Sequence, residues 1–118
     1  MTKQPVTIET LRHIALAFPG MEEYPCWYGK PAFRVRGNTL ARVRKDGESL
    51  VIRINDPIER DFLLENEPDV YYANADIDHP YVFVRLATIS PDELQRIFEN
   101  AWRAAAPKRL IAEYDNQP

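Results

Sequence analysis

The sequence has little of the chemistry that supports disulfides, metal sites or nucleotide loops. Its 118 residues include one cysteine, Cys26, which excludes an internal disulfide and leaves no second cysteine for a structural zinc site. The two histidines, His13 and His79, have no partner at metal-ligand spacing. None of the four glycines stands in the spacing of a phosphate-binding loop. We therefore expect no metal, no cofactor and no enzymatic activity, since an active site would need a three-dimensional constellation that the sequence does not reveal.

Long hydrophobic runs are also missing. The longest apolar stretches are a few residues, far below the roughly 18 to 20 that cross a bilayer, and the first residues lack the apolar segment of a signal peptide. Hydrophobic residues nevertheless make up 45% of the chain, enough to bury a core. No repeat or linker divides the sequence. We expect one cytoplasmic domain over residues 1–118, with its core at about 7–111, and no membrane partner.

What the sequence does contain is a segregated charge. Residues 30–54 hold seven basic and two acidic side chains, a formal charge of +5, whereas the rest of the chain holds eight basic and sixteen acidic ones, a formal charge of −8. Such segregation can place a positive field on one surface of an otherwise negative protein, and that surface attracts polyanions or acidic partners. The pattern indicates a binding module.

The same basic segment alternates with a period of two residues. Apolar and arginine side chains alternate over 32–36 and 40–44, and a further apolar run covers 49–54. Gly37-Asn38 and Asp46-Gly47 separate the three runs and are typical of tight turns. The pattern predicts a three-stranded antiparallel meander, with Arg34 and Arg36 on one strand face.

Helices are predicted on both sides of this meander. Thr7, Asp56 and Ser90 are suitable N-caps, and the last two are followed by proline and then by an acid at the capping-box position. The predicted order is a helix at about 7–18, three strands, a helix ending at Pro68, strands at 70–73 and 81–87, and a helix closed by Pro107. This order indicates an α+β fold in which an antiparallel sheet carries helices on one face.

Several of these segments together resemble the MmcQ/YjbR family of small bacterial proteins. The resemblance covers roughly residues 10–111 and is carried by the order and spacing of Trp27–Phe33, Leu40–Val43, Leu50–Arg53, Asp56-Pro57, His79 with Val82–Leu86, and Ala106–Leu110. It implies a sandwich similar to the frataxin-like CyaY fold and a double-wing DNA-binding module. It also implies a nucleic-acid role.

The residues themselves favour the same role. Arginine suits planar, bidentate contacts with phosphate, and a strand hairpin can lie along a nucleic-acid backbone. The predicted contacts to the DNA phosphate backbone are Lys30, Arg34, Arg36, Arg42, Arg44, Lys45 and Arg53, extended by Lys108 and Arg109 if the C-terminal end folds back.

Other interpretations of these residues stay open. Exposed strands often carry long basic side chains that cover apolar surface and blunt edge pairing, and the formal net charge of −3 departs from the usual basic footprint of a nucleic-acid binder. An acidic protein could occupy the same face. As the alternative function, Trp27 and His79 could line an aromatic cleft for a protein partner or a small ligand.

Overall fold

The computed structural model describes residues 6–75, 77 and 79–117, and in this part of the chain six strands form one antiparallel sheet in the order β1-β2-β3-β4-β6-β5. The strands are β1 (Met21–Pro25), β2 (Pro31–Val35), β3 (Asn38–Val43), β4 (Ser49–Arg53), β5 (Tyr71–Tyr72) and β6 (Tyr81–Arg85). The helices are α1 (Ile8–Leu16), the 3-10 turn η1 (Trp27–Gly29), α2 (Pro57–Asn66), α3 (Pro91–Ala105) and α4 (Lys108–Asp115). This is the α+β fold that the sequence predicts.

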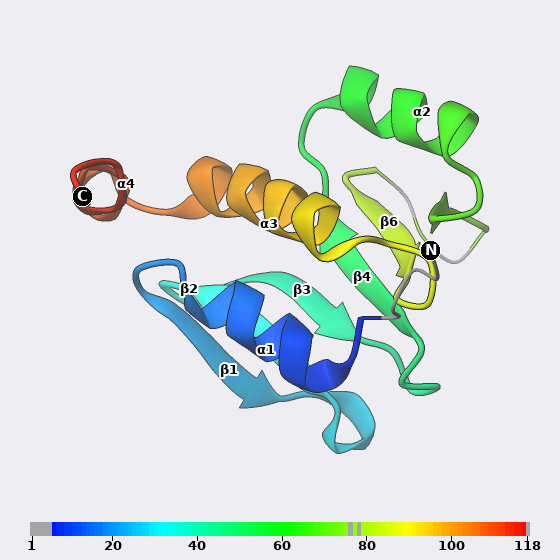
Figure 1. The fold of residues 1–118 in the computed structure, drawn as a ribbon, viewed down its shortest axis with the longest axis horizontal. Coiled ribbons are helices and arrows are strands. Elements are labelled where there is room, and N and C mark those ends of the chain that lie inside the picture. The colour runs from blue at the N-terminus through cyan, green and yellow to red at the C-terminus, as the bar shows by residue number, and fades with distance from the viewer. Residues whose placement is uncertain (1–5, 76, 78, 118) are drawn as a thin grey trace.

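Helices α1 and α3 lie side by side over one face of the sheet (Figure 1). The core between these layers contains Phe33 of β2 and Phe98 of α3, whose rings meet edge to face with centroids 6.0 Å apart. Trp102 of α3 is fully buried, and its indole N–H donates to the Pro19 carbonyl at 2.9 Å. The apolar stripe on α3 therefore fixes which sheet face is covered.

The predicted caps are confirmed. The side-chain oxygens of Thr7, Asp56 and Ser90 accept hydrogen bonds from backbone N–H groups in the first turns of α1, α2 and α3. Each bond satisfies a donor that the helix itself leaves without a partner. Among the helices in the described part of the chain, none is long and apolar enough to cross a bilayer.

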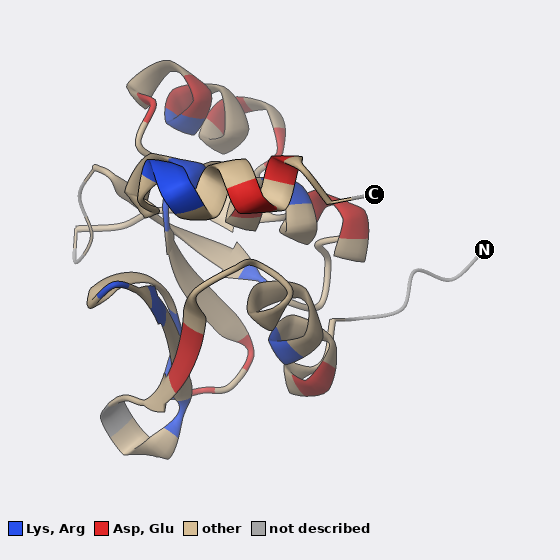
Figure 2. Cartoon of the chain, turned by 90° about the vertical axis from the view of Figure 1, so that its left-hand side faces the viewer, with Lys and Arg blue, Asp and Glu red and all other residues tan. Residues whose placement is uncertain are grey.

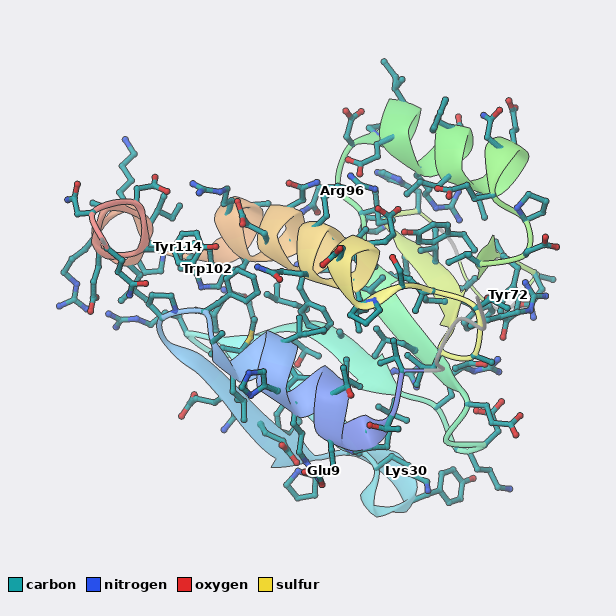
Figure 3. All side chains as sticks on the ribbon, viewed as in Figure 1. Glu9, Lys30, Tyr72, Arg96, Trp102 and Tyr114 are labelled. Carbon is teal, nitrogen blue, oxygen red and sulfur yellow. The ribbon has the colours of Figure 1, made fainter. Side chains whose placement is uncertain are left out.

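Two elements were not predicted. Strand β1 is an edge strand with the sequence Met-Glu-Glu-Tyr-Pro, and only Met21 of its residues is buried, so it lacks the alternation that marks a half-buried strand. Helix α4 begins directly after Pro107, which ends α3 as expected and also caps α4. The Tyr114 ring of α4 packs against Trp102 at 5.2 Å between centroids (Figure 3).

The first turn of the meander lies one residue earlier than expected. Arg36 and Gly37 are the two residues with positive φ, 51° and 80°, so they form the turn and Asn38 already begins β3. Arg36 is therefore at the hairpin tip and does not share a strand face with Arg34, which corrects the prediction. The second turn, at Asp46-Gly47, is as predicted, and Asp46 Oδ1 accepts from the backbone N–H groups of Glu48 and Ser49.

Candidate nucleic-acid interface

The face of the sheet away from the helices, which we call the open face, gathers four of the nine predicted basic side chains. Residues paired across neighbouring antiparallel strands share a face, so the register identifies its members. Ala32, Val51 and Phe83 are buried yet do not belong to the core under the helices, which places this row on the opposite side. The open face consists of Glu22, Tyr24, Ala32, Arg34, Thr39, Arg42, Ser49, Val51, Arg53, Tyr72, Tyr81, Phe83 and Arg85, together with Arg44 just after β3, which lies over the Phe83 ring.

One row of side chains crosses the middle of this face. Arg42 stands between Ala32 and Val51, and the row continues through Phe83 to Tyr72 at the short edge strand β5. A bulge opposite Phe33 and Arg34 shifts the register between β2 and β3, and Leu40 and Ala41 are both in the core. The row therefore has an apolar floor with a guanidinium at its centre.

Beside this row, at the end nearest the Asp46-Gly47 turn, Arg44 lies over the Phe83 ring, with its guanidinium carbon 4.2 Å from the centroid. Arg44 Nη1 also donates to the Tyr72 hydroxyl at 3.3 Å, and that hydroxyl is 3.1 Å from Ser49 Oγ. The guanidinium carbon of Arg85 is 4.1 Å from the Tyr72 centroid. Aromatic rings thus hold both arginines against the sheet.

At the opposite end of the face, Arg34 and Arg53 are held in the same way. The Arg34 guanidinium carbon is 4.5 Å from the Tyr24 centroid, and its Nε is 3.6 Å from Glu22 Oε1, an ion pair longer than a hydrogen bond. The Arg53 guanidinium carbon is 6.0 Å from the Tyr81 centroid. Within the described residues, the Nε atoms of Arg34 and Arg53 are buried and have no hydrogen-bond partner.

Arginines in the helix layer make a different set of contacts. Arg96 Nε is 2.8 Å from Glu93 Oε1, Arg103 Nη2 is 2.6 Å from Asp115 Oδ1, and Arg12 Nε is 2.9 Å from a carboxylate oxygen of Glu23. Hydrogen bonding to these carboxylates raises the pKa of all three guanidinium groups. These three basic side chains are thus paired with acids, whereas four arginines of the open face lie on aromatic rings. Figure 2 shows basic residues along the strands, acidic residues on β1, and both signs of charge on the helices.

Two loops add to the positive end of the face. The Lys45 ammonium nitrogen is 4.8 Å from the Tyr28 centroid, and Lys30 Nζ lies 3.5 Å from where a Cβ on Gly47 would be. Tyr28 is 70% exposed and has φ 59° and ψ 24°, a left-handed conformation that costs a residue other than glycine about 1 kcal/mol or more. The η1 turn thus presents an aromatic ring to solvent beside two lysines.

A hollow of about 730 Å³ lies over strands β3, β4 and β6 on the open face. Its apolar floor includes Val51 and Phe83, which are 5% and 3% exposed. The other lining residues include basic, aromatic and loop side chains: Arg42, Arg44, Lys45, Tyr28, Tyr81, Ile77 and His79. Arg42, Arg44 and His79, which the sequence-based predictions assign to alternative sites, therefore line a single hollow.

The structure brings together most but not all of the predicted site residues. Arg34, Arg42, Arg44 and Arg53 share the open face, and Lys30 and Lys45 adjoin it at the second turn. Arg36 is exposed at the tip of the first hairpin. Lys108 and Arg109 are exposed on α4, whose Leu110 belongs to the core on the helix side of the sheet, so they do not extend this face. His79 lines the hollow, and the Trp27 side chain is outside the described part of the structure.

The predicted basic site left out four residues that contribute to this surface. Tyr72 of β5 and Phe83 and Arg85 of β6 come 18 to 31 residues after the basic segment ends at Ile54, and Tyr28 comes from the preceding turn. A usable signal existed, because Tyr81, Phe83 and Arg85 alternate with the apolar residues of their strand.

Across the described residues, no group of three histidine, cysteine or acidic side chains could hold a metal ion.

Comparison with known proteins gives the family context. The YjbR family model matches residues 16–104. Uncharacterized protein Rv2570 of Mycobacterium tuberculosis and Uncharacterized protein Mb2600 of Mycobacterium bovis are each 33% identical over 69 residues, which is 58% of this chain and 54% of the relative. The match thus spans about half the length of these relatives. The crystal structure of Deinococcus radiodurans protein DR2400, a DUF419 domain, superposes with a TM-score of 0.72 at 16% identity, covering 98% of this chain and 92% of that one.

Proposed function

This chain belongs to the YjbR family, and we propose that it is a non-enzymatic DNA-binding protein that holds phosphates on the open face of its sheet. The observation that carries the proposal is the convergence of Arg34, Arg42, Arg44 and Arg53 on the one sheet face that the helices leave uncovered. A scattered set of the same residues would produce no coherent field.

The way these arginines are held also supports phosphate binding. A guanidinium group that lies on an aromatic ring keeps its N–H edge available for planar contacts, and phosphate accepts such contacts in pairs. Arg44 on Phe83 and Arg85 on Tyr72 have this geometry, with one Nη1 donor of each already used, by the Tyr72 hydroxyl and by the Pro68 carbonyl respectively. Their positions are set before a ligand arrives, which lowers the entropy cost of binding.

Acidic groups elsewhere set the expected strength. The formal net charge is −3, and nine of the 18 acids are in the helices, so a polyanion is attracted on one side and repelled on others. We expect weak binding without sequence preference, with Kd in the range of about 1–100 µM at physiological salt. With about four phosphate contacts on duplex DNA, a plot of log K against log salt has a slope of roughly −3 to −4.

The test is a salt-titrated DNA-binding measurement on the wild type and on the double variant Arg42→Gln, Arg44→Gln. At about 50 mM salt we expect the variant to bind about ten- to a hundredfold more weakly, because two central phosphate contacts are lost. Its salt slope should be less steep by about 2 units. Urea denaturation of both proteins checks that the variant is folded.

The matched control is the double variant Lys108→Gln, Arg109→Gln. It removes the same charge from α4, which lies on the other side of the core from the open face. Salt screens the effect of charges that are farther from the open face than the Debye length, which is about 10 Å at 0.1 M. We expect its affinity to stay within about twofold of the wild type. Equal losses in the two double variants, or no binding by the wild type at low salt, would rule the proposal out.

A second candidate function is supported by the hollow itself. Its volume of about 730 Å³ is within the range of small-molecule sites, and Tyr28 and His79 line it together with Arg42. A small anionic ligand with a flat ring, or an acidic protein, could use the same surface. Competition of the DNA complex by nucleotides and by poly-glutamate at constant ionic strength separates these partners, because only a true ligand competes beyond its effect as a salt.

A further inference from the structure

We infer that the nucleic acid bound here is single-stranded, with at least one unstacked base seated in the hollow over β3, β4 and β6. The inference rests on the proposed function and names its substrate class. It predicts a preference for single strands over duplex of the same length.

The shape of the basic surface favours a single strand. Strands β3 and β4 are inner strands of the six-stranded sheet, so their basic side chains do not stand on a projecting hairpin. Arg44, Arg34 and Arg85 lie against rings at 4.1–4.5 Å from the centroids, so they are held down along the sheet. Reading a duplex groove calls for an element that enters it, usually a helix or a two-stranded ribbon. A chain laid over a sheet face needs no such projection.

The composition of the hollow matches a base. A nucleobase has apolar faces and a polar edge, and it stacks on aromatic side chains or on guanidinium planes. Val51 and Phe83 provide an apolar floor, and the exposed rings of Tyr28 and Tyr81 line the sides. Because a duplex keeps its bases stacked and paired, it cannot fill this space. A single strand can place a base there while its phosphates meet the basic side chains at the rim.

Tyr28 is the residue that this inference singles out. Its ring is 70% exposed and lines the hollow, although its backbone is in the left-handed region. Strained conformations of this kind cluster at binding sites, where the surrounding structure maintains them. Lys45 lies 4.8 Å from the ring centroid, which puts a positive charge next to the stacking surface. Tyr28 and Lys45 would thus meet a base and its phosphate together.

The experiment measures fluorescence anisotropy of labelled 12-mers at one salt concentration: oligo-dT, oligo-rU and a 12-base-pair duplex. For the wild type we expect oligo-dT to bind at least about tenfold more tightly than the duplex. Tyr28→Ala should weaken oligo-dT about tenfold and the duplex less than twofold, because it removes a stacking partner and no charge. The oligo-rU arm separates RNA from DNA as the preferred strand.

The matched control is Phe62→Ala, which removes an exposed aromatic ring from α2, outside the hollow, and should change neither affinity. Duplex binding equal to or tighter than oligo-dT, or the same loss for both in Tyr28→Ala, overturns the single-strand inference. In that case a large effect of the Arg42, Arg44 double variant on duplex leaves the proposed function standing. Failure of both oligo-dT and the DNA duplex to bind at low salt contradicts the proposed function instead.

Discussion

Two arginines of the same chemistry should have opposite effects on stability when each is replaced by methionine. Arg53 is on the open face, and its Nε is buried without a hydrogen-bond partner among the described residues. Arg96 is in the helix layer, where its guanidinium donates to Glu93 at 2.8 and 2.9 Å and to Glu59 at 3.0 Å (Figure 3). Methionine keeps most of the apolar stem at both positions and removes the charge, so it isolates the polar contribution.

The magnitudes follow from these contacts. At Arg53, methionine removes an unsatisfied donor that costs about 1–2 kcal/mol, and it loses a cation–π contact, 6.0 Å from the Tyr81 centroid, worth about 0.5 kcal/mol. The free energy of unfolding should therefore rise by about 0.5–1.5 kcal/mol. At Arg96, three hydrogen bonds to partly buried carboxylates are lost, which should lower the free energy of unfolding by about 1–2 kcal/mol.

Urea denaturation of the wild type and both variants measures the two changes, and the DNA-binding assay is run on the same samples. Arg53→Met should gain stability and lose affinity, because the open face holds charge that binding uses and folding does not. Arg96→Met should lose stability and keep its affinity. A loss of stability in Arg53→Met comparable to that in Arg96→Met would refute the reasoning, since it would mean that the open-face arginines serve the fold.

Two further predictions concern α4. Gly37 has φ 80° and open space around it, so Gly37→Ala should lower the free energy of unfolding, measured by urea denaturation, by about 1 kcal/mol. Gly20 has φ 76°, and a new Cβ there would lie 2.6 Å from Leu110 Cδ1 of α4, so Gly20→Ala should lower it by about 1 kcal/mol more. Equal losses in the two variants would mean that α4 is not closely packed against Gly20. Hydrogen bonding to Arg103 lowers the pKa of Asp115 in the folded protein. This carboxylate therefore stabilises the fold fully at pH values above its pKa in the unfolded chain, about 3.9, and the contribution is lost as the pH falls through the lower pKa of the folded state. The difference in Tm between the wild type and Asp115→Asn should therefore vanish in acid, and a constant difference down to pH 2 would contradict the linkage.

Much of the fold was predictable because its signals are local. Thr7, Asp56 and Ser90 cap helices through their own neighbouring backbone, and the period of two residues in the basic segment marks strands wherever they end up in the sheet. Strand β1 and helix α4 escaped prediction because neighbouring elements stabilise them: β1 by pairing with β2, and α4 through Leu110 and Tyr114 against the core.

The sequence by itself determined that a segment of charge +5 would form antiparallel strands with arginine on alternate positions, because both properties belong to residues close together in the chain. Only the tertiary structure decided that α1 and α3 cover the other face, that Arg85 and Phe83 join the arginines of β3 and β4, and that Lys108 is kept away from them. Alternation assigns side chains to two faces, but which face is left uncovered depends on strand register and helix packing between distant residues.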